Sequence, residues 1–118
     1  MIQRFRPQQR VRRPQDFQTI CKKGKFLKGK FLNIWCCESA EAPEGPKLGL
    51  IVTRKVNTRA TQRNLWRRRI RESFRLMQEE IKNNMAFVVQ ARKLGEAPPL
   101  REISDEMKEM LAKAGFLK

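Results

Sequence analysis

The side chains between Arg54 and Arg75 are the ones in this sequence best suited to bind a chemical group. This segment holds nine Lys or Arg residues and a single acidic residue, Glu72. A guanidinium is planar and always charged, so it can bind a phosphate through two parallel hydrogen bonds and can also stack on a base. Ion pairs with one carboxylate cannot neutralise nine cations. The residue types therefore predict contact with the phosphate backbone of a nucleic acid.

A long helix, which we expect over residues 58–83, must position most of these side chains. At about 100° per residue its apolar residues form one stripe, which we expect to pack in the core. The stripe comprises Trp66, Ile70, Phe74, Met77 and Ile81. The polar residues beside it, which we name the arginine flank, are Asn64, Arg67, Arg68, Arg71 and Arg75.

Four more cations extend this surface at the start of the helix. Arg59 and Arg63 continue the line of the apolar stripe, where an unpaired charge would be costly to bury. The start of the helix should therefore project beyond the sheet and add both side chains to the basic surface. Arg54 and Lys55, in the preceding turn, complete the predicted nucleic-acid-binding set.

The net charge of +15 is concentrated in two blocks of the chain. Residues 1–30 carry +9 and residues 54–75 carry +8, whereas residues 31–53 carry −2 and residues 76–118 are neutral. This asymmetry is typical of a surface that meets a polyanion. We interpret residues 1–13 as a basic N-terminal arm. Its last arginines are Arg10, Arg12 and Arg13.

The remaining pattern indicates a single α+β domain over residues 1–118. Helical signals cover residues 14–23 and a last helix that begins within residues 100–104 and ends near Gly115. Strand signals cover three segments, residues 30–37, 47–53 and 85–92. The third segment is apolar enough to be buried on both faces. The expected order α-β-β-α-β-α makes a sandwich of three helices on a small, mainly antiparallel sheet, in which a hairpin of the first two strands is the simplest pairing.

Two aromatic residues outside the long helix have two possible roles. Trp35 lies on the strand face opposite Leu32 and Ile34, where an exposed aromatic would stack on single-stranded bases and contribute about 1–3 kcal/mol per base. The alternative is packing under a helix, since aromatics are most often core residues. Spacing does not decide between the two for Trp35, and Phe17 has the same two alternatives.

The sequence offers few residues for catalysis by the protein itself. It has no histidine, and Cys21, Cys36 and Cys37 form no CxxC pair, so we expect no zinc site and interpret the cysteines as small buried hydrophobes. The acidic residues of the last helix form either an exposed, solvated face or a carboxylate cluster that binds Mg²⁺ ions. We expect no membrane span and no signal peptide, and we predict a cytoplasmic protein.

The segment Lys47–Arg75 (KLGLIVTRKVNTRATQRNLWRRRIRESFR) resembles the signature of the protein subunit of bacterial ribonuclease P. That family has a strand of the form LGxxVSKK, followed by a helix that opens with RNRxKRxxRExFR. The strand is matched here by Leu48-Gly49 and by Val52-Thr53-Arg54-Lys55. The helix is matched by Arg63-Asn64, Arg67-Arg68, Arg71-Glu72 and Phe74-Arg75. Leu65 departs from the pattern because the family has a third basic residue there, and Cys21 stands where a second aromatic is common.

The resemblance implies both a fold and a role. The fold would be ribosomal-protein-S5-domain-2-like, with a left-handed βαβ crossover that runs through the arginine helix. The protein would join a catalytic RNA, as a monomer in a 1:1 complex, and help it to remove the 5′ leader of precursor tRNA. The RNA would perform the chemistry with Mg²⁺ that it holds itself, and the arginine helix would face this RNA.

The resemblance also implies a cleft between the first helix and the sheet that holds the single-stranded leader. The residues assigned to this cleft are Arg10, Arg12, Arg13, Phe17, Lys30 and Trp35. Charge alone would equally fit a ribosomal or other structural RNA-binding protein without a role in cleavage. A protein-only nuclease is a third hypothesis.

Overall fold

The structure, a computed structural model, describes residues 11, 14–38, 46–81, 85–92 and 95–117 of the chain. In chain order the elements are α1 (Pro14–Lys23), β1 (Lys25–Lys28), β2 (Leu32–Glu38), β3 (Lys47–Ile51), α2 (Ala60–Met77), the 3₁₀ turn η2 (Gln78–Glu80), β4 (Met85–Ala91) and α3 (Leu100–Ala114). Three helices thus accompany a four-stranded mixed sheet, and the predicted α+β class is confirmed.

The sheet has the strand order β1-β2-β4-β3, with β4 in its centre. β2 pairs antiparallel with both β1 and β4. β3 pairs parallel with β4, and the crossover helix α2 connects these two strands along the chain. The predicted hairpin between the strands at residues 30–37 and 47–53 is therefore wrong. β4 separates these strands because almost all of its residues are buried, and a strand that is apolar on both faces is most stable inside a sheet with both faces covered.

The sequence prediction omits β1, which is an edge strand of only four residues. Two of those residues are lysines, and most of the strand is exposed. Short, charged strands are a common way to protect a sheet edge from unwanted pairing, and they carry little hydrophobic pattern. The order of elements along the chain is therefore α-β-β-β-α-β-α rather than the predicted α-β-β-α-β-α.

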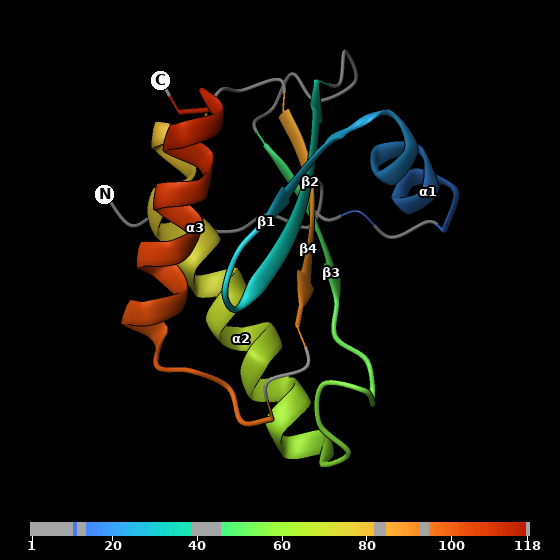
Figure 1. The fold of residues 1–118 in the computed structure, drawn as a ribbon, viewed down its shortest axis with the longest axis vertical. Coiled ribbons are helices and arrows are strands. Elements are labelled where there is room, and N and C mark those ends of the chain that lie inside the picture. The colour runs from blue at the N-terminus through green and yellow to red at the C-terminus, as the bar shows by residue number, and fades with distance from the viewer. Residues whose placement is uncertain (1–10, 12–13, 39–45, 82–84, 93–94, 118) are drawn as a thin grey trace.

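Helices cover the two faces of the sheet unequally. α2 and α3 lie together on one face, and α1 covers part of the other face (Figure 1). Alternate residues of β2 point to opposite faces, so Leu32, Ile34 and Cys36 pack under α2 and α3. The side chains of Trp35 and Cys37 point to the α1 face, where the buried cluster is small.

The stripe of α2 forms the main core, as the wheel predicts. Trp66, Ile70, Phe74 and Met77 are buried against α3 and the sheet. The helix ends at Met77 rather than near residue 83, because the chain tightens into η2. Ile81 is buried as expected, but it lies beyond the helix and pairs with Leu117 in an isolated bridge.

The other two helices have the predicted bounds, and a glycine follows each. The backbone amide of Gly24 donates to the Ile20 carbonyl at 2.7 Å, and a Cβ on Gly24 would lie only 2.4 Å from the same oxygen. Gly115 ends α3 at a φ of 79°, a conformation that favours glycine. Neither these helices nor α2 is long and apolar enough to cross a membrane.

The cysteines correct one expectation. Cys36 is buried in the main core, whereas Cys21 and Cys37 are only half-buried. Both half-buried residues lie against the small cluster under α1, and α1 covers only part of that sheet face.

Candidate nucleic-acid interface

The arginine flank lies on the side of α2 that faces the end of β3. The Nη2 atom of Arg67 donates to the Val52 carbonyl at 3.1 Å, and its Nη1 atom donates to Asn64 Oδ1 at the same distance. Arg67 is therefore half-buried and links the helix to the sheet edge. Its neighbour Arg68 is exposed, as are Asn64 and Arg59, so these side chains are accessible to a ligand.

The predicted residues upstream of the helix gather at the same end of the molecule. Arg54 and Lys55 are exposed in the turn that follows β3. Arg63 is half-buried, because its Nη1 atom donates to the carbonyls of Asn57 and Thr58 at 3.1 and 2.8 Å and so closes the link between strand and helix. The expectation that Arg63 projects freely is therefore only partly correct.

Arg75, at the far end of the flank, is paired with the one acidic residue of the run. Its Nε atom donates to Glu72 Oε2 at 3.0 Å, and its Nη2 atom forms a shorter bond with Glu72 Oε1. These hydrogen bonds lower the pKa of Glu72 below its usual value. Arg71 is half-buried beside them.

Arg69 belongs to the opposite side of α2 and has a structural role. Its Nη1 atom donates to the carbonyls of Ala97 and Pro98 at 2.9 and 2.6 Å. Trp66 Nε1 donates to the Gly95 carbonyl at 3.3 Å, and so a second side chain of α2 holds the same loop. The α2 helix thus has one side that binds the loop before α3 and another that carries the arginine flank.

The second candidate surface is the sheet face beside α1. The strand register places Phe26, Trp35, Val88 and Gly49 in one row across all four strands, which we name the aromatic row. The rings of Phe26 and Trp35 lie 5.0 Å apart at 44°, and Phe26 is 47% exposed. A row of this kind provides a stacking surface for unpaired bases.

Phe17 of α1 packs on the β3 end of the aromatic row. A Cβ on Gly49 would lie 2.7 Å from Phe17 Cε1 and 3.0 Å from Val11 Cβ, so the α1 ring packs directly on the backbone of β3. The backbone amide of Val11 donates to the Leu48 carbonyl at 2.9 Å, which places Val11 at the β3 edge. Phe17 and Trp35 are both half-buried, so each combines packing with partial exposure.

A polar row follows the aromatic row along the strands. It contains Lys28, Asn33, Gln90 and Ile51. Asn33 Nδ2 donates to Gln90 Oε1 at 3.2 Å, and Asn33 Oδ1 has no hydrogen-bond partner among the described residues. Such side-chain amides can hydrogen-bond to base edges.

The structure brings together only some of the predicted leader-binding residues. Phe17 and Trp35 meet at the same sheet face, whereas Lys30 is exposed in the β1–β2 turn with its ammonium group 5.1 Å from the Phe31 ring. The arginines of the N-terminal arm, Arg10, Arg12 and Arg13, lie outside the described residues.

Sequence reasoning missed Phe26, Asn33 and Gln90 as members of this face. The only available signal for an edge strand that carries Phe26 was the short segment KFLK just before Gly29, in which two apolar residues lie between two lysines. Asn33 and Gln90 become neighbours only through the β2–β4 register, which no local pattern specifies.

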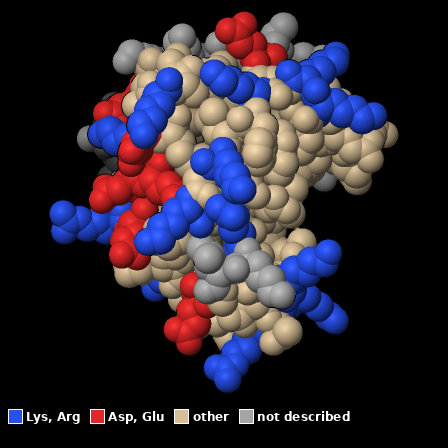
Figure 2. All heavy atoms as spheres, in the orientation of Figure 1, with Lys and Arg blue, Asp and Glu red and all other residues tan. Residues whose placement is uncertain are grey.

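The carboxylates of α3 do not form a metal site. Among the residues that the structure describes, no group of three or more His, Cys, Asp or Glu side chains could hold a metal ion. Glu109 pairs with Lys113 at 3.0 Å, and Glu80 at the end of η2 pairs with Lys108 at 3.5 Å. Figure 2 shows acidic side chains gathered over α3, whereas Lys and Arg side chains extend over the rest of this face. The solvated-face interpretation of α3 therefore fits better than a carboxylate cluster.

Comparison with known proteins identifies the family. The family model described as Ribonuclease P matches residues 5–115. The chain belongs to the Ribonuclease P protein family. A ribonuclease P protein component from Pseudanabaena sp. (strain PCC 6903) is 30% identical over 110 residues, covering 93% of this chain and 94% of its relative. One from Vesicomyosocius okutanii is 39% identical over 82 residues, which is 70% of each chain.

Solved structures of ribonuclease P proteins share the fold. The Staphylococcus aureus protein superposes with a TM-score of 0.82 at 26% identity, over 93% of this chain and 98% of that one. The Thermotoga maritima protein superposes with a TM-score of 0.75 at 26% identity, over 88% and 96%. The prediction of a ribonuclease P subunit is thus confirmed. The chain is the accessory protein of the ribonucleoprotein that processes the 5′ end of tRNA, and it works with the ribonuclease P RNA.

Proposed function

We propose that this ribonuclease P protein binds two RNAs at once, each on its own surface. The arginine flank, with Arg54, Lys55, Arg59 and Arg63, binds the catalytic RNA. The sheet face beside α1 binds the single-stranded 5′ leader of precursor tRNA. The observation that carries the proposal is the placement of these surfaces on different layers, since α2 lies on one side of the sheet and the aromatic row on the other (Figure 1).

Charge supports the assignment of the flank to the larger RNA. Residues 54–75 carry +8 with only Glu72 to offset it, and like charges three or four residues apart on a helix repel each other. A phosphate backbone removes this repulsion and releases counterions, which makes binding strong and dependent on salt. A rigid helix that presents several arginines suits a folded RNA of fixed shape.

Aromatic side chains support the assignment of the other face to the leader. Unpaired bases can stack on Phe26 and Trp35, and the amides of Asn33 and Gln90 lie one row further along the strands, about 7 Å away. Arg10 and Arg12 flank Val11, whose backbone bonds to β3, and Arg13 follows them; we assign these three arginines, with Lys30, to the leader phosphates. A double helix would not offer bases for stacking, so this surface selects single-stranded RNA.

The remaining assignments follow from the division of labour between protein and RNA. Because the described carboxylates form no metal site, we assign the Mg²⁺ required for cleavage to the RNA subunit. The protein contributes substrate affinity and charge neutralisation. We further propose a monomer in a 1:1 complex with the RNA, located in the cytoplasm.

Binding assays with two single-residue variants test the proposal. Holoenzyme assembled with a bacterial catalytic RNA should bind precursor tRNA more tightly than mature tRNA, and Trp35→Ala should reduce this preference by roughly ten-fold, the contribution of about one stacked base. Arg68→Ala should instead weaken the protein–RNA assembly and leave the leader preference unchanged. Equal affinity of the wild-type holoenzyme for both tRNAs would refute the leader assignment.

A further inference from the structure

One carboxylate of α3, that of Glu106, is bound by the turn between β1 and β2. Its Oε1 atom accepts from the backbone amides of Lys30 and Phe31 at 2.5 and 3.1 Å. Its Oε2 atom accepts from the amides of Phe31 and Leu32 at 2.8 and 2.9 Å. Three successive backbone N–H groups thus converge on one side chain that lies about 75 residues away in sequence.

The chain around the turn is shaped to allow this contact. A Cβ on Gly29 would lie 2.9 Å from Glu106 Cδ and 2.6 Å from Met110 Sδ, so a larger residue there would push the ends of these two side chains away from the turn. On the other side, the Nη1 atom of Arg92 donates to the Gly29 carbonyl at 2.6 Å. The turn is therefore held from two directions, by an anion at its amides and by a cation at its carbonyl.

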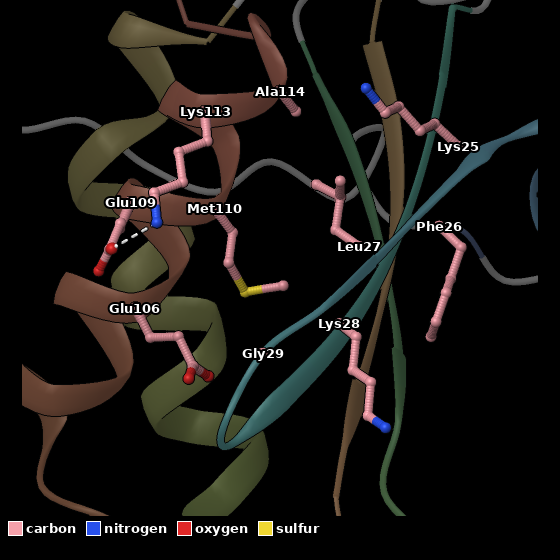
Figure 3. Close-up of a pocket in the computed structure, with 10 residues that line it drawn as sticks. All are labelled: Lys25, Phe26, Leu27, Lys28, Gly29, Glu106, Glu109, Met110, Lys113 and Ala114. Atoms are coloured by element: carbon pink, nitrogen blue, oxygen red, sulfur yellow. Dashed lines mark ion pairs between the residues drawn. The ribbon is translucent and has the colours of Figure 1, made fainter.

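This contact matters because β1 has little other polar support. β1 is an edge strand and pairs only with β2. Its other edge faces a groove of about 400 Å³ between β1 and α3, which is lined by Leu27, Lys28, Met110 and Lys113 among others. Figure 3 shows the Glu106 side chain, one of those that line this groove, directed from α3 toward the turn at Gly29. Among the described residues, the hydrogen bonds between α3 and the β1–β2 hairpin are those that the Glu106 carboxylate accepts.

We propose that Glu106 is a positioning residue for leader binding, an inference that rests on the proposed function of the sheet face. Fixing the turn fixes the register of β1 against β2, and that register holds Phe26 beside Trp35. The same turn carries Lys30, whose amide is one of the three bound donors. Glu106 itself lies on the α3 side of the sheet, so it acts on the leader through the hairpin without touching RNA.

The chemistry of the site requires a carboxylate. Glu106→Gln keeps the length of the side chain, but its amide nitrogen would face a backbone N–H and its charge would be lost. The matched control is Glu109→Gln on the same helix, which makes an equal change in net charge. Glu109 is exposed, and its pair with Lys113 is a surface ion pair of small energetic value.

The first measurement compares leader preference and assembly in the holoenzyme. For Glu106→Gln the ratio of affinities for precursor and mature tRNA should fall roughly three- to ten-fold, because one stacked base loses part of its platform. Affinity for the catalytic RNA should stay within about two-fold of wild type, a change of only a few tenths of a kcal/mol. Glu109→Gln should change neither quantity. A parallel loss of both affinities in Glu106→Gln would show a general structural defect and overturn the proposal.

The second measurement examines the turn alone and is independent of the leader assignment. Amide hydrogen exchange at Lys30, Phe31 and Leu32 should accelerate in Glu106→Gln and remain slow in Glu109→Gln. If exchange is unchanged, Glu106 does not hold the turn, and the proposal is wrong. A wild-type holoenzyme without leader preference would instead refute the proposed leader-binding surface. Faster exchange with full leader preference would also overturn the positioning role. Glu106→Asp, which keeps the charge, provides the same comparison if Glu106→Gln does not fold.

Discussion

Two adjacent arginines of α2 have different surroundings and therefore different roles. Arg68 is exposed and, within the described part of the chain, has no hydrogen bond or ion pair. Arg69 donates to two carbonyls of the loop before α3. The matched family signature includes a basic residue at position 68 but not at position 69, and the structure shows that Arg68 is accessible to RNA whereas Arg69 is already engaged.

Alanine substitutions at these two positions should give opposite results. Arg68→Ala should weaken binding to the catalytic RNA and lower the salt dependence by about one phosphate contact, with a change in unfolding free energy below about 0.5 kcal/mol. Arg69→Ala should lose about 1–3 kcal/mol of stability with a smaller effect on RNA binding. Filter binding at several salt concentrations and urea denaturation measure the two effects. Equal loss of stability in both variants would show that α2 is oriented differently.

Cys36 should make the stability of the protein depend on pH in the alkaline range. Burial in the core raises the pKa of this thiol to about 12, from an ordinary value of 9.0. The unfolded chain therefore loses the proton first, so the contribution of the thiol to stability is complete below pH 9 and declines as pH rises toward 12. The decline should approach about 1.4 kcal/mol per pH unit.

Urea unfolding under reducing conditions at pH 8 and pH 10 should reveal this contribution. Wild type should lose more stability between the two pH values than Cys36→Ala does. The comparison is made between the two proteins because all their other titratable groups are the same. An identical pH dependence would contradict the buried position of the thiol.

At the scale of elements, the packing of α1 on β3 depends on Gly49. The missing side chain lets the Phe17 ring approach the β3 backbone, and a methyl group would lie within 2.7 Å of that ring. Gly49→Ala should therefore cost about 1–3 kcal/mol of stability through overpacking and should displace α1 from the aromatic row.

A double-mutant cycle tests this contact. If Gly49→Ala acts through the Phe17 ring, it should cost much less in a Phe17→Ala background than in wild type, with a coupling energy of about 1 kcal/mol or more. Thermal or urea unfolding of the four proteins measures it. Additive effects would mean that Gly49 serves the strand for another reason, such as backbone flexibility.

Local patterns predicted the elements well and their arrangement less well. The apolar stripe from Trp66 to Met77 placed the helix and its buried face correctly, since burial on one side imposes a 3.6-residue period. The predicted hairpin failed because strand order depends on contacts between segments far apart in sequence, here β2 with β4. The half-burial of Arg63 and Arg67 could not be predicted either, because it depends on hydrogen bonds to the backbone carbonyls of Asn57, Thr58 and Val52, which no side-chain pattern indicates.

The sequence likewise predicted one part of the candidate site better than the other. The arginine flank is contiguous in sequence, so helical periodicity defined it. The face beside α1 is assembled from four strands, and its members Phe26, Asn33 and Gln90 are neighbours only through the register. Trp35, for which spacing left two roles open, is half-buried against the α1 cluster and also contacts the exposed Phe26.

In the whole molecule, the sheet and its core separate the two surfaces that we propose to bind RNA. The molecule is small, with a radius of gyration of 13.2 Å, so both surfaces lie within reach of a single RNA–tRNA complex. Under this proposal, the core between them sets the distance between the leader and the catalytic RNA. In the function that we propose, the protein contributes positive charge and holds the substrate, and the RNA performs the reaction.

The most direct test is cleavage of precursor tRNA by a bacterial ribonuclease P RNA at low Mg²⁺ concentration, with and without this protein. At low Mg²⁺ the RNA lacks the cations that would screen its phosphates, and the arginines of this chain can replace part of that screening. We predict that the 5′ leader is removed when both components are present and that the protein alone, treated to remove RNA, releases none. Cleavage by the RNA-free protein, or no gain on adding the protein to the RNA, would contradict the account.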